Sequence, residues 1–325
     1  AMRQVSEGTM RRLFLPERVG GSVPPEISVV DMRKQKTHRT TSTFSPVMVE
    51  AIRENMASGE QTMVFLNHRG YSQYLQCFRC GCTIECPHCS VTMKFHKADN
   101  LLRCHMCGNS EGLPDQCPDC GSRALRFHGI GTERIFNQLR RAFKDARIER
   151  MDRDTVSKKG EYQRIIEACE QGEVDILVGT QMIAKGLDFP GVTLVCVVSA
   201  DSIINMPDFR SGERTYQLLT QVAGRAGRRT DPGKVIVQTF VPQHPAIKAA
   251  CAHDPDSFYE HELEARRDAG YPPYTVMVNF IVTTEEEPEG YDTALKLADN
   301  LREEIERGVP QDYFGILGPA PAAFF

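Results

Sequence analysis

Four Cys-x-x-Cys pairs lie close together in this chain: Cys77 and Cys80, Cys86 and Cys89, Cys104 and Cys107, and Cys117 and Cys120. Each pair places two thiolates on one tight turn, and two pairs supply the four tetrahedral ligands that a structural zinc ion requires. The sequence therefore predicts two zinc ions per chain, in a module that spans residues 77–121. Four cysteines at each site leave no position for water, which indicates a structural and not a catalytic metal.

The spacing of the pairs favours one way of combining them. Five residues separate Cys80 from Cys86, too few to fold a zinc ribbon comfortably, whereas fourteen separate Cys89 from Cys104, enough for a β-hairpin. We therefore expect a nested arrangement, with the second and third pairs on an inner zinc and the first and fourth on an outer one. A crossed arrangement stays open at this point, because spacing alone does not exclude it.

Other residues of the region could also bind metal: His88, His96, His105 and Cys82. Eight cysteines already fill two sites, so we expect ordinary surface histidines and a cysteine that is not a ligand. A redox role of the thioredoxin type requires one pair of low pKa in its own fold context, and four pairs fit that role poorly.

Composition limits the class of protein. The 325 residues give room for roughly two or three domains. No apolar run approaches the roughly 20 residues of a membrane span, and no secretory signal begins the chain. Nine of the twelve cysteines lie in the zinc region. Clustered cysteines without an export signal are typical of metal binding in a reducing compartment, so we expect a cytoplasmic protein with no membrane partner.

The distribution of charge is uneven. The formal net charge of −4 argues against DNA binding by bulk electrostatics, yet residues 121–159 hold eleven Arg and Lys against five Asp and Glu. This basic stretch could contact phosphates. It could equally be a solvated helix face, and charge alone leaves both interpretations open for Arg134, Arg140, Arg141 and Lys144.

Around the zinc region, strands and helices alternate. A loop-rich lead is followed by predicted strands at 62–66, 147–151, 175–178, 192–198 and 234–240, and by predicted helices at 47–57, 132–144, 161–171 and 213–223. We expect Ser45 and Thr132 to cap the first two of these helices. Continuous apolar strands such as 192–198 are typical of a parallel sheet that is buried on both faces, so an α/β fold with a mostly parallel sheet is predicted.

Pro242 and Pro245 indicate a domain boundary. Beyond them a helix at 257–269, a strand at 276–283 and an acidic helix at 291–307 predict a partial α+β C-terminal domain that is truncated at Phe325. The predicted division is therefore 1–76, the start of the sheet domain; 77–121, the zinc module; 122–241, the rest of the sheet domain; and 242–325, the truncated domain.

Two further segments have residues suited to phosphate chemistry. Residues 179–190 directly follow a buried strand, where α/β sheets place their ligand loops. Residues 215–228 end in Gly224-Arg225-Ala-Gly227-Arg228, which puts two arginines at the end of a helix. Guanidinium groups so placed can reach the γ-phosphate of a nucleotide, although a basic surface turn has the same pattern.

The same segments carry a family resemblance. Gly-Thr-Gln-Met-Ile-Ala-Lys-Gly-Leu-Asp-Phe-Pro at 179–190 resembles motif V of superfamily-2 helicases, and Gln-Val-Ala-Gly-Arg-Ala-Gly-Arg at 221–228 resembles motif VI. Together with Asn67-His-Arg-Gly-Tyr71, Asp152-Arg-Asp-Thr155 and the eight-cysteine insertion, they resemble the PriA (primosomal protein N′) family of replication-restart DNA helicases. The resemblance runs from about Arg12 to the C-terminus. Cys82 departs from it, since we expect an aromatic residue there.

The resemblance implies a RecA-like helicase lobe 2 that carries the zinc module in its nested pairing. It implies that Arg225 and Arg228 are arginine fingers, that Gly186 and Asp188 line the nucleotide, and that Thr180 and Gln181 lie on the path of the translocated strand. The cofactors of the whole protein would be ATP and Mg²⁺ in addition to zinc. The family moves 3′ to 5′ on single-stranded DNA, recognises stalled forks and restarts replication by primosome assembly. Its partners would include helicase-loading proteins and single-stranded DNA-binding protein, in the cytoplasm and at the bacterial nucleoid.

One absence from the sequence limits this expectation. No Gly-x-x-x-x-Gly-Lys-Ser/Thr loop and no Asp-Glu-x-His segment occurs, so the phosphate cradle and the magnesium carboxylate of a helicase are missing. We therefore expect this chain alone not to hydrolyse ATP. The alternatives are a zinc-dependent protein-interaction scaffold on an inactive helicase-like core, and a zinc-ribbon DNA-binding regulator. The latter is disfavoured because two Zn²⁺ with eight thiolates carry a charge of about −4.

Overall fold

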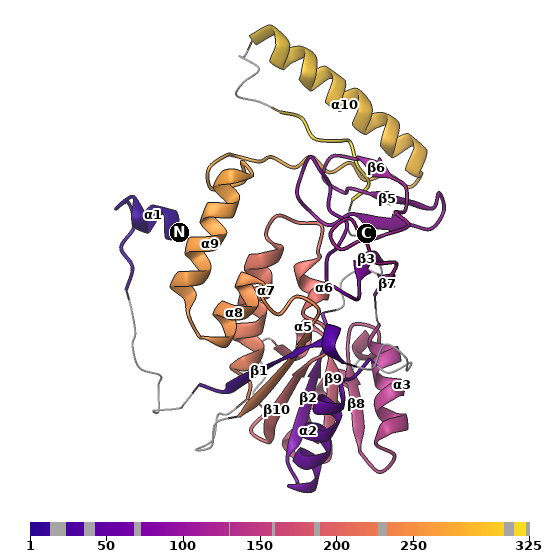
Figure 1. Ribbon diagram of the computed structural model, residues 1–325, viewed down its shortest axis with the longest axis vertical. Helices are drawn as coiled ribbons and strands as arrows, with labels where there is room; N and C mark the ends of the chain where they lie inside the picture. Colours follow the sequence, from indigo (N-terminus) through magenta and orange to yellow (C-terminus); the bar gives the residue numbers. More distant parts are fainter. Residues whose placement is uncertain are drawn as a thin grey trace.

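A six-stranded sheet forms the centre of the computed structural model (Figure 1), which describes residues 1–13, 24–35, 43–67, 73–129, 131–157, 160–184, 189–226, 233–308 and 315–322. The strand order is β1-β11-β10-β2-β9-β8, and every neighbouring pair is parallel. The bounds are β1 Glu26–Asp31, β2 Gln61–Phe65, β8 Ile148–Met151, β9 Ile176–Gly179, β10 Val192–Val197 and β11 Lys234–Thr239. The predicted α/β fold is confirmed.

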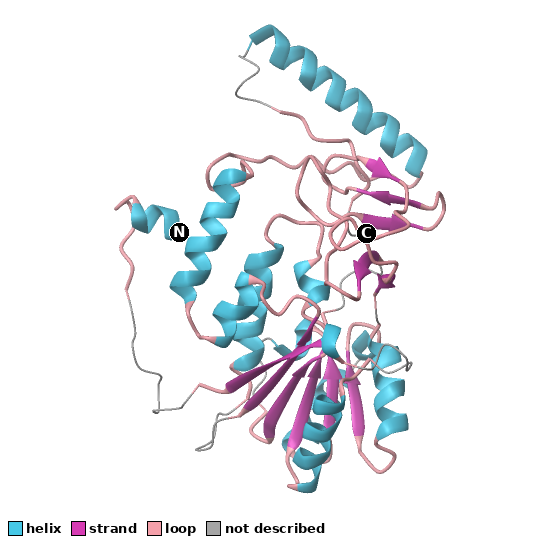
Figure 2. Cartoon of the chain, in the orientation of Figure 1, coloured by secondary structure: helices cyan, strands magenta, loops and turns pink. Residues whose placement is uncertain are grey.

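Helices cover both faces of this sheet (Figure 2), because its central strands have no polar face. Along β2, Met63 and Phe65 enter one hydrophobic core, whereas Val64 and the following Leu66 enter the other, as the two-residue period of a strand dictates. One face carries α2 (Pro46–Ala57) and α3 (Thr132–Ala142). The other carries α4 (Glu161–Glu170), α7 (Ser211–Ala223) and α8 (Pro245–Cys251).

The zinc module is inserted between β2 and α3. Strands β3 (Tyr74–Cys77) and β7 (Leu125–His128) pair antiparallel at its base. The chain between them forms a small antiparallel sheet of β4 (Lys94–His96), β5 (Leu101–Arg103) and β6 (Ser110–Glu111), with a hydrophobic core of its own. The hairpin predicted between Cys89 and Cys104 is thus confirmed as β4–β5.

The two predicted helix caps have different outcomes. Ser45 caps α2 as predicted, because its side chain accepts a hydrogen bond from the backbone N–H of Met48. The prediction for Thr132 is wrong, since Gly131 is the N-cap of α3. The Thr132 hydroxyl instead donates to Asp152 Oδ2 at 2.6 Å, which ties α3 to the end of β8.

Short elements complete the sheet domain and the N-terminal part: α1 (Met2–Ser6), the 3₁₀ turns η2 (Met32–Lys34) and η4 (Thr155–Ser157), α5 (Gln181–Ala184) and α6 (Asp201–Ile204). Strand β1 was not anticipated in the loop-rich lead. It lies at an edge of the sheet, where half-exposed side chains weaken the apolar pattern. None of the helices in the described part of the chain has the length and apolar content that a bilayer crossing needs.

The C-terminal part contains α9 (Pro255–Asp268) and α10 (Glu287–Gly308). The predicted strand at 276–283 is wrong: these residues pair with no described strand, and Val276 and Ile281 are 91% and 73% exposed. Ala246 of α8 and Phe258 of α9 belong to the same core as the central sheet. The packing of the sheet domain therefore extends past residue 241, while the division of the chain there stays a proposal.

Candidate functional site

All four Cys-x-x-Cys pairs fold into the same turn. The first cysteine of each pair donates its backbone N–H to the carbonyl five residues later, as Cys77 does to Cys82 and Cys104 does to Asn109 at 2.8 Å. The residue after each second cysteine has a positive φ: Gly81, Ser90, Gly108 and Gly121. This left-handed position is the reason why three of the four pairs are followed by glycine.

The turns bring the eight cysteines into two groups. The inner group is Cys86, Cys89, Cys104 and Cys107, and the outer group is Cys77, Cys80, Cys117 and Cys120. Within each group all Sγ atoms lie within 4.8 Å of one another. The nested pairing predicted from the spacing is confirmed, and the crossed alternative is excluded.

The sulfur positions fit zinc. The Sγ atoms of Cys77 and Cys120 are 3.7 Å apart, and those of Cys86 and Cys107 are 3.6 Å apart. Four thiolates at about 2.3 Å from a tetrahedral zinc ion lie about 3.8 Å from one another. Each group therefore has the donor set and the spacing of a closed, structural zinc site.

The remaining candidate ligands stay outside both groups. Cys82 donates its thiol to the Thr83 carbonyl, and burial, followed by the charge of Asp119, raises its pKa to about 12. His88 is exposed, as predicted. The prediction for His96 and His105 is wrong, because both are half-buried, with their Nε2 atoms 3.1 Å apart. The carbonyl of Pro321 accepts a hydrogen bond from His105 Nδ1.

The outer zinc site rests on the sheet domain. Gly81 has a φ of +88°, and a Cβ atom there would lie 2.3 Å from the Phe240 carbonyl oxygen at the end of β11. From the end of β1, Arg33 pairs with Asp31 and donates to the carbonyl of Cys80 at 3.3 Å. The backbone of this turn is therefore held against the carboxyl end of the sheet.

This close approach predicts that Gly81→Ala displaces the module, whereas Gly121→Ala does not. Both glycines have positive φ, so each alanine costs about 1–2 kcal/mol in backbone strain. Only Gly81 adds a backbone clash, since nothing lies within 4 Å of a Cβ at Gly121. Thermal unfolding of the zinc-loaded chain should show a clearly larger loss for Gly81→Ala. Equal losses in the two variants would contradict the docking contact.

A second group of predicted residues gathers at the same edge of the sheet. Asn67 follows β2, and Thr180 and Gln181 follow the neighbouring β9. Gln181 Nε2 donates to Asn67 Oδ1 at 3.2 Å. Arg225, just past α7, donates its Nε to the carbonyl of Ala184 at the end of α5, at 3.0 Å. The described residues Asn67, Gln181 and Arg225, one from each of the three motif-bearing segments, thus lie at one edge of the sheet.

Three of the predicted nucleotide residues, Gly186, Asp188 and Arg228, lie outside the described residues. The basic face of α3 can be assessed. Arg134, Arg140, Arg141 and Lys144 are exposed, and none forms an ion pair with a described residue. These side chains form a solvated basic face, and both interpretations that charge left open remain predictions.

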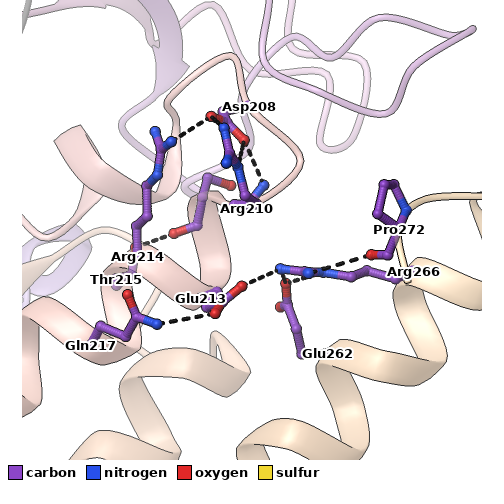
Figure 3. Close-up of polar contacts among 10 residues, drawn as sticks. Asp208, Arg210, Glu213, Arg214, Thr215, Gln217, Glu262, Arg266 and Pro272 are labelled. Carbon is purple, nitrogen blue, oxygen red and sulfur yellow. Dashed lines mark hydrogen bonds and ion pairs between the residues drawn. The ribbon is translucent and has the colours of Figure 1, made fainter. Parts of the chain in front are cut away.

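Sequence reasoning missed a cluster of charges at the start of α7 (Figure 3). The guanidinium of Arg266 on α9 contacts Glu213 of α7 and Glu262 of its own helix, both at 2.7 Å. Just before α7, Asp208 pairs with Arg210 and Arg214 at 3.0 and 2.9 Å. Burial alone would raise the pKa of Asp208, but its hydrogen bonds to Arg210 and the charge of Arg214 lower it. The four-residue spacing of Glu262 and Arg266 was a usable signal.

Two parts of the chain match known domain families. Residues 86–111 match the PriA DNA helicase Cys-rich region domain, and residues 125–230 match the helicase conserved C-terminal domain. The first match contains the inner zinc ligands, and the second contains Gln181 and Arg225.

Similar curated proteins have one common description. The replication restart protein PriA of Bacillus subtilis (strain 168) is 46% identical over 299 residues, which are 92% of this chain and 37% of the relative. The protein of the same description from Haemophilus influenzae is 36% identical over 324 residues, 100% of this chain and 43% of the relative. The chain thus spans about two fifths of the length of these relatives.

Among solved structures, the Pyrococcus furiosus Hef helicase domain matches 59% of this chain and 25% of its own, with 20% identity and a TM-score of 0.28. That likeness is too low to bear on the fold or the function.

Proposed function

This chain belongs to the PriA family of replication restart proteins, and from this membership we propose that it supplies one motor lobe and the zinc module of an ATP-dependent DNA helicase. The sheet domain is a RecA-like helicase lobe with an inserted module of two four-cysteine sites. The residues after 241 would belong to the start of a further domain.

The contact between Arg225 and Ala184 carries the most weight. A hydrogen bond of 3.0 Å connects the segment that resembles motif VI to the one that resembles motif V, at the carboxyl edge of a parallel sheet. Ligands of open α/β sheets bind outside this edge. A scaffold protein has no physical need to place an arginine there.

In this proposal ATP binds between this lobe and a second one that carries the phosphate cradle and the magnesium carboxylate. Arg225 and Arg228 stabilise the charge that develops on the γ-phosphate during transfer. Gly186 and Asp188 line the same side of the nucleotide. Thr180 and Gln181 contact the backbone of single-stranded DNA, along which the protein moves 3′ to 5′.

Each zinc ion, when bound, links two distant turns and supplies no chemistry of its own. We propose that the module acts at the junction of a stalled fork. The whole protein would cooperate with primosome and helicase-loading proteins and with single-stranded DNA-binding protein, in the bacterial cytoplasm at the nucleoid.

The test compares the longest natural protein that contains this chain with the chain alone. The longer protein should hydrolyse ATP, and forked DNA should increase its rate. The chain alone should show no turnover above a no-enzyme control, because the sequence provides no phosphate cradle. Both samples should hold two zinc ions. DNA-stimulated ATP hydrolysis by the chain alone would contradict the proposal that a second lobe supplies the phosphate cradle and the magnesium carboxylate. No turnover by either protein would favour the zinc-dependent scaffold.

A further inference from the structure

Lys94, on β4 of the zinc module, is a buried cation that takes no part in metal binding. Its side chain is 4% exposed, yet none of the ion pairs between described residues includes it. The ammonium donates to the backbone carbonyl of Asn205 at 2.8 Å and lies 4.6 Å from the ring centre of Tyr74. Burial lowers its pKa to about 7. Without a carboxylate beside it the charged form of this amine is costly to bury, and the hydrogen bond to Asn205 holds the group in place in either protonation state.

Asn205 accepts further hydrogen bonds from side chains of the module. Its side-chain Oδ1 accepts hydrogen bonds from the hydroxyls of Thr83 and Thr92, at 3.2 and 3.3 Å. Asn205 is itself 5% exposed and is the C-cap of α6 in the sheet domain. Three side chains of the zinc module therefore converge on one residue that ends a helix of the motor lobe.

The other end of α6 is held as well. Gln76, on β3 at the base of the module, donates to Asp201 Oδ1 at 3.0 Å. The Asp201 carboxylate also accepts the backbone N–H of Phe240 at 3.1 Å. The module thus contacts both ends of this one-turn helix.

The loop after α6 is connected to the inner zinc site. Tyr271, beyond α9, donates its hydroxyl to the carbonyl of the ligand Cys89 at 2.5 Å. Its ring stacks on Phe209 with the ring centres 4.8 Å apart and the planes 11° from parallel. Phe209 lies just before α7, so these contacts continue from α6 to the start of the helix that ends at Ala223, two residues before Arg225.

We propose that Lys94 and Asn205 anchor the zinc module to the motor lobe, so that the two move as one body and deliver the nucleotide-driven movement of the lobe to the DNA junction. This inference rests on the proposed function. Both are positioning residues. Along the chain the anchor precedes α7, and neither Lys94 nor Asn205 belongs to the segments proposed to bind the nucleotide. A loosened anchor should therefore reduce strand separation and leave ATP hydrolysis nearly unchanged.

The test uses the longest natural protein with Lys94→Met, which keeps the length of the side chain and removes its charge. Lys97→Met is the matched control, because Lys97 is exposed in the turn of the same hairpin. Zinc content, DNA-stimulated ATP hydrolysis and unwinding of a forked substrate are measured for each protein. We expect two zinc ions in every protein, ATP hydrolysis within about twofold of wild type, and base pairs unwound per ATP reduced at least tenfold in Lys94→Met alone.

Unchanged unwinding per ATP in a zinc-loaded Lys94→Met protein would overturn the proposal. If that variant fails to fold or loses zinc, Thr83→Val with Thr92→Val replaces it, because valine keeps the shape and removes only the two donors to Asn205. That double variant should also lose unwinding per ATP, and normal unwinding would again refute the anchor. Absence of ATP hydrolysis in the wild-type protein would instead refute the proposed function on which the inference rests.

Discussion

Replacing Arg225 by alanine in the longest natural protein that contains this chain should lower DNA-stimulated ATP hydrolysis by roughly a thousandfold. Arginine fingers stabilise charge that appears only in the transition state, so the loss should fall on kcat and not on the affinity for DNA. In the structure Arg225 is half-buried and hydrogen bonded to Ala184, so its guanidinium is pre-positioned beside the segment that resembles motif V. Steady-state hydrolysis and DNA binding, measured in parallel, separate the two effects.

Two comparisons sharpen this result. Arg225→Lys keeps the charge but loses the planar fork of donors, so it should also lose most of the activity. Arg164→Ala removes an exposed arginine of α4 that pairs with Glu149 and Glu161, and it should hydrolyse ATP like wild type. Arg228→Ala is expected to behave like Arg225→Ala. Wild-type kcat in both the Arg225 and Arg228 variants would rule out their role as arginine fingers.

The second large effect is expected at the inner zinc site, where Cys104→Ser should reduce the zinc content from two ions per chain to one. Cys104 is 0% exposed and belongs to the small core of the module, so loss of its ligand bond should also unfold the β4–β5 hairpin. Structural zinc contributes about 10–16 kcal/mol to the folding of small zinc domains, most of which this site would forfeit. Metal analysis and thermal unfolding of the purified chain measure both consequences.

Cys82→Ser is the matched control, because Cys82 lies in the same module without belonging to either ligand group. It should keep two zinc ions and unfold at nearly the wild-type temperature. A zinc loss in this variant, or full zinc occupancy in Cys104→Ser, would contradict the assignment of the ligands.

Much of the site could be predicted because it depends on short stretches of chain. Each Cys-x-x-Cys turn is closed by its own backbone hydrogen bonds, so the spacing between Cys89 and Cys104 predicted the hairpin and favoured the nested pairing, which only the structure distinguished from the crossed one. Strands such as β10 were recognisable since a strand buried on both faces is almost entirely apolar, with Thr193 the one polar residue of this strand. Edge strand β1 lacks that pattern and was missed.

Prediction failed where the partner of a segment is remote. The apolar residues 276–283 have the composition of a strand, but a strand forms only when a neighbour accepts its hydrogen bonds, and the described part of the chain offers none. Thr132 has the chemistry of a helix cap, yet the buried carboxylate of Asp152 takes its hydroxyl. Helix α8 was overlooked because Pro245, which suggested a boundary, is its first residue.

The sequence by itself determined the four Cys-x-x-Cys pairs, a preference for their nested combination, the parallel sheet and the two segments suited to phosphate chemistry, because periodicity and spacing express these features within a few tens of residues. Only the tertiary structure decided that Lys94 donates a hydrogen bond to the carbonyl of Asn205, 111 positions away. The same holds for Tyr271, which donates to the carbonyl of Cys89 across 182 positions. Such contacts leave no local pattern. They depend on which surfaces the open sheet and the Cys-x-x-Cys turns bring together, and that is fixed only when the whole chain has packed.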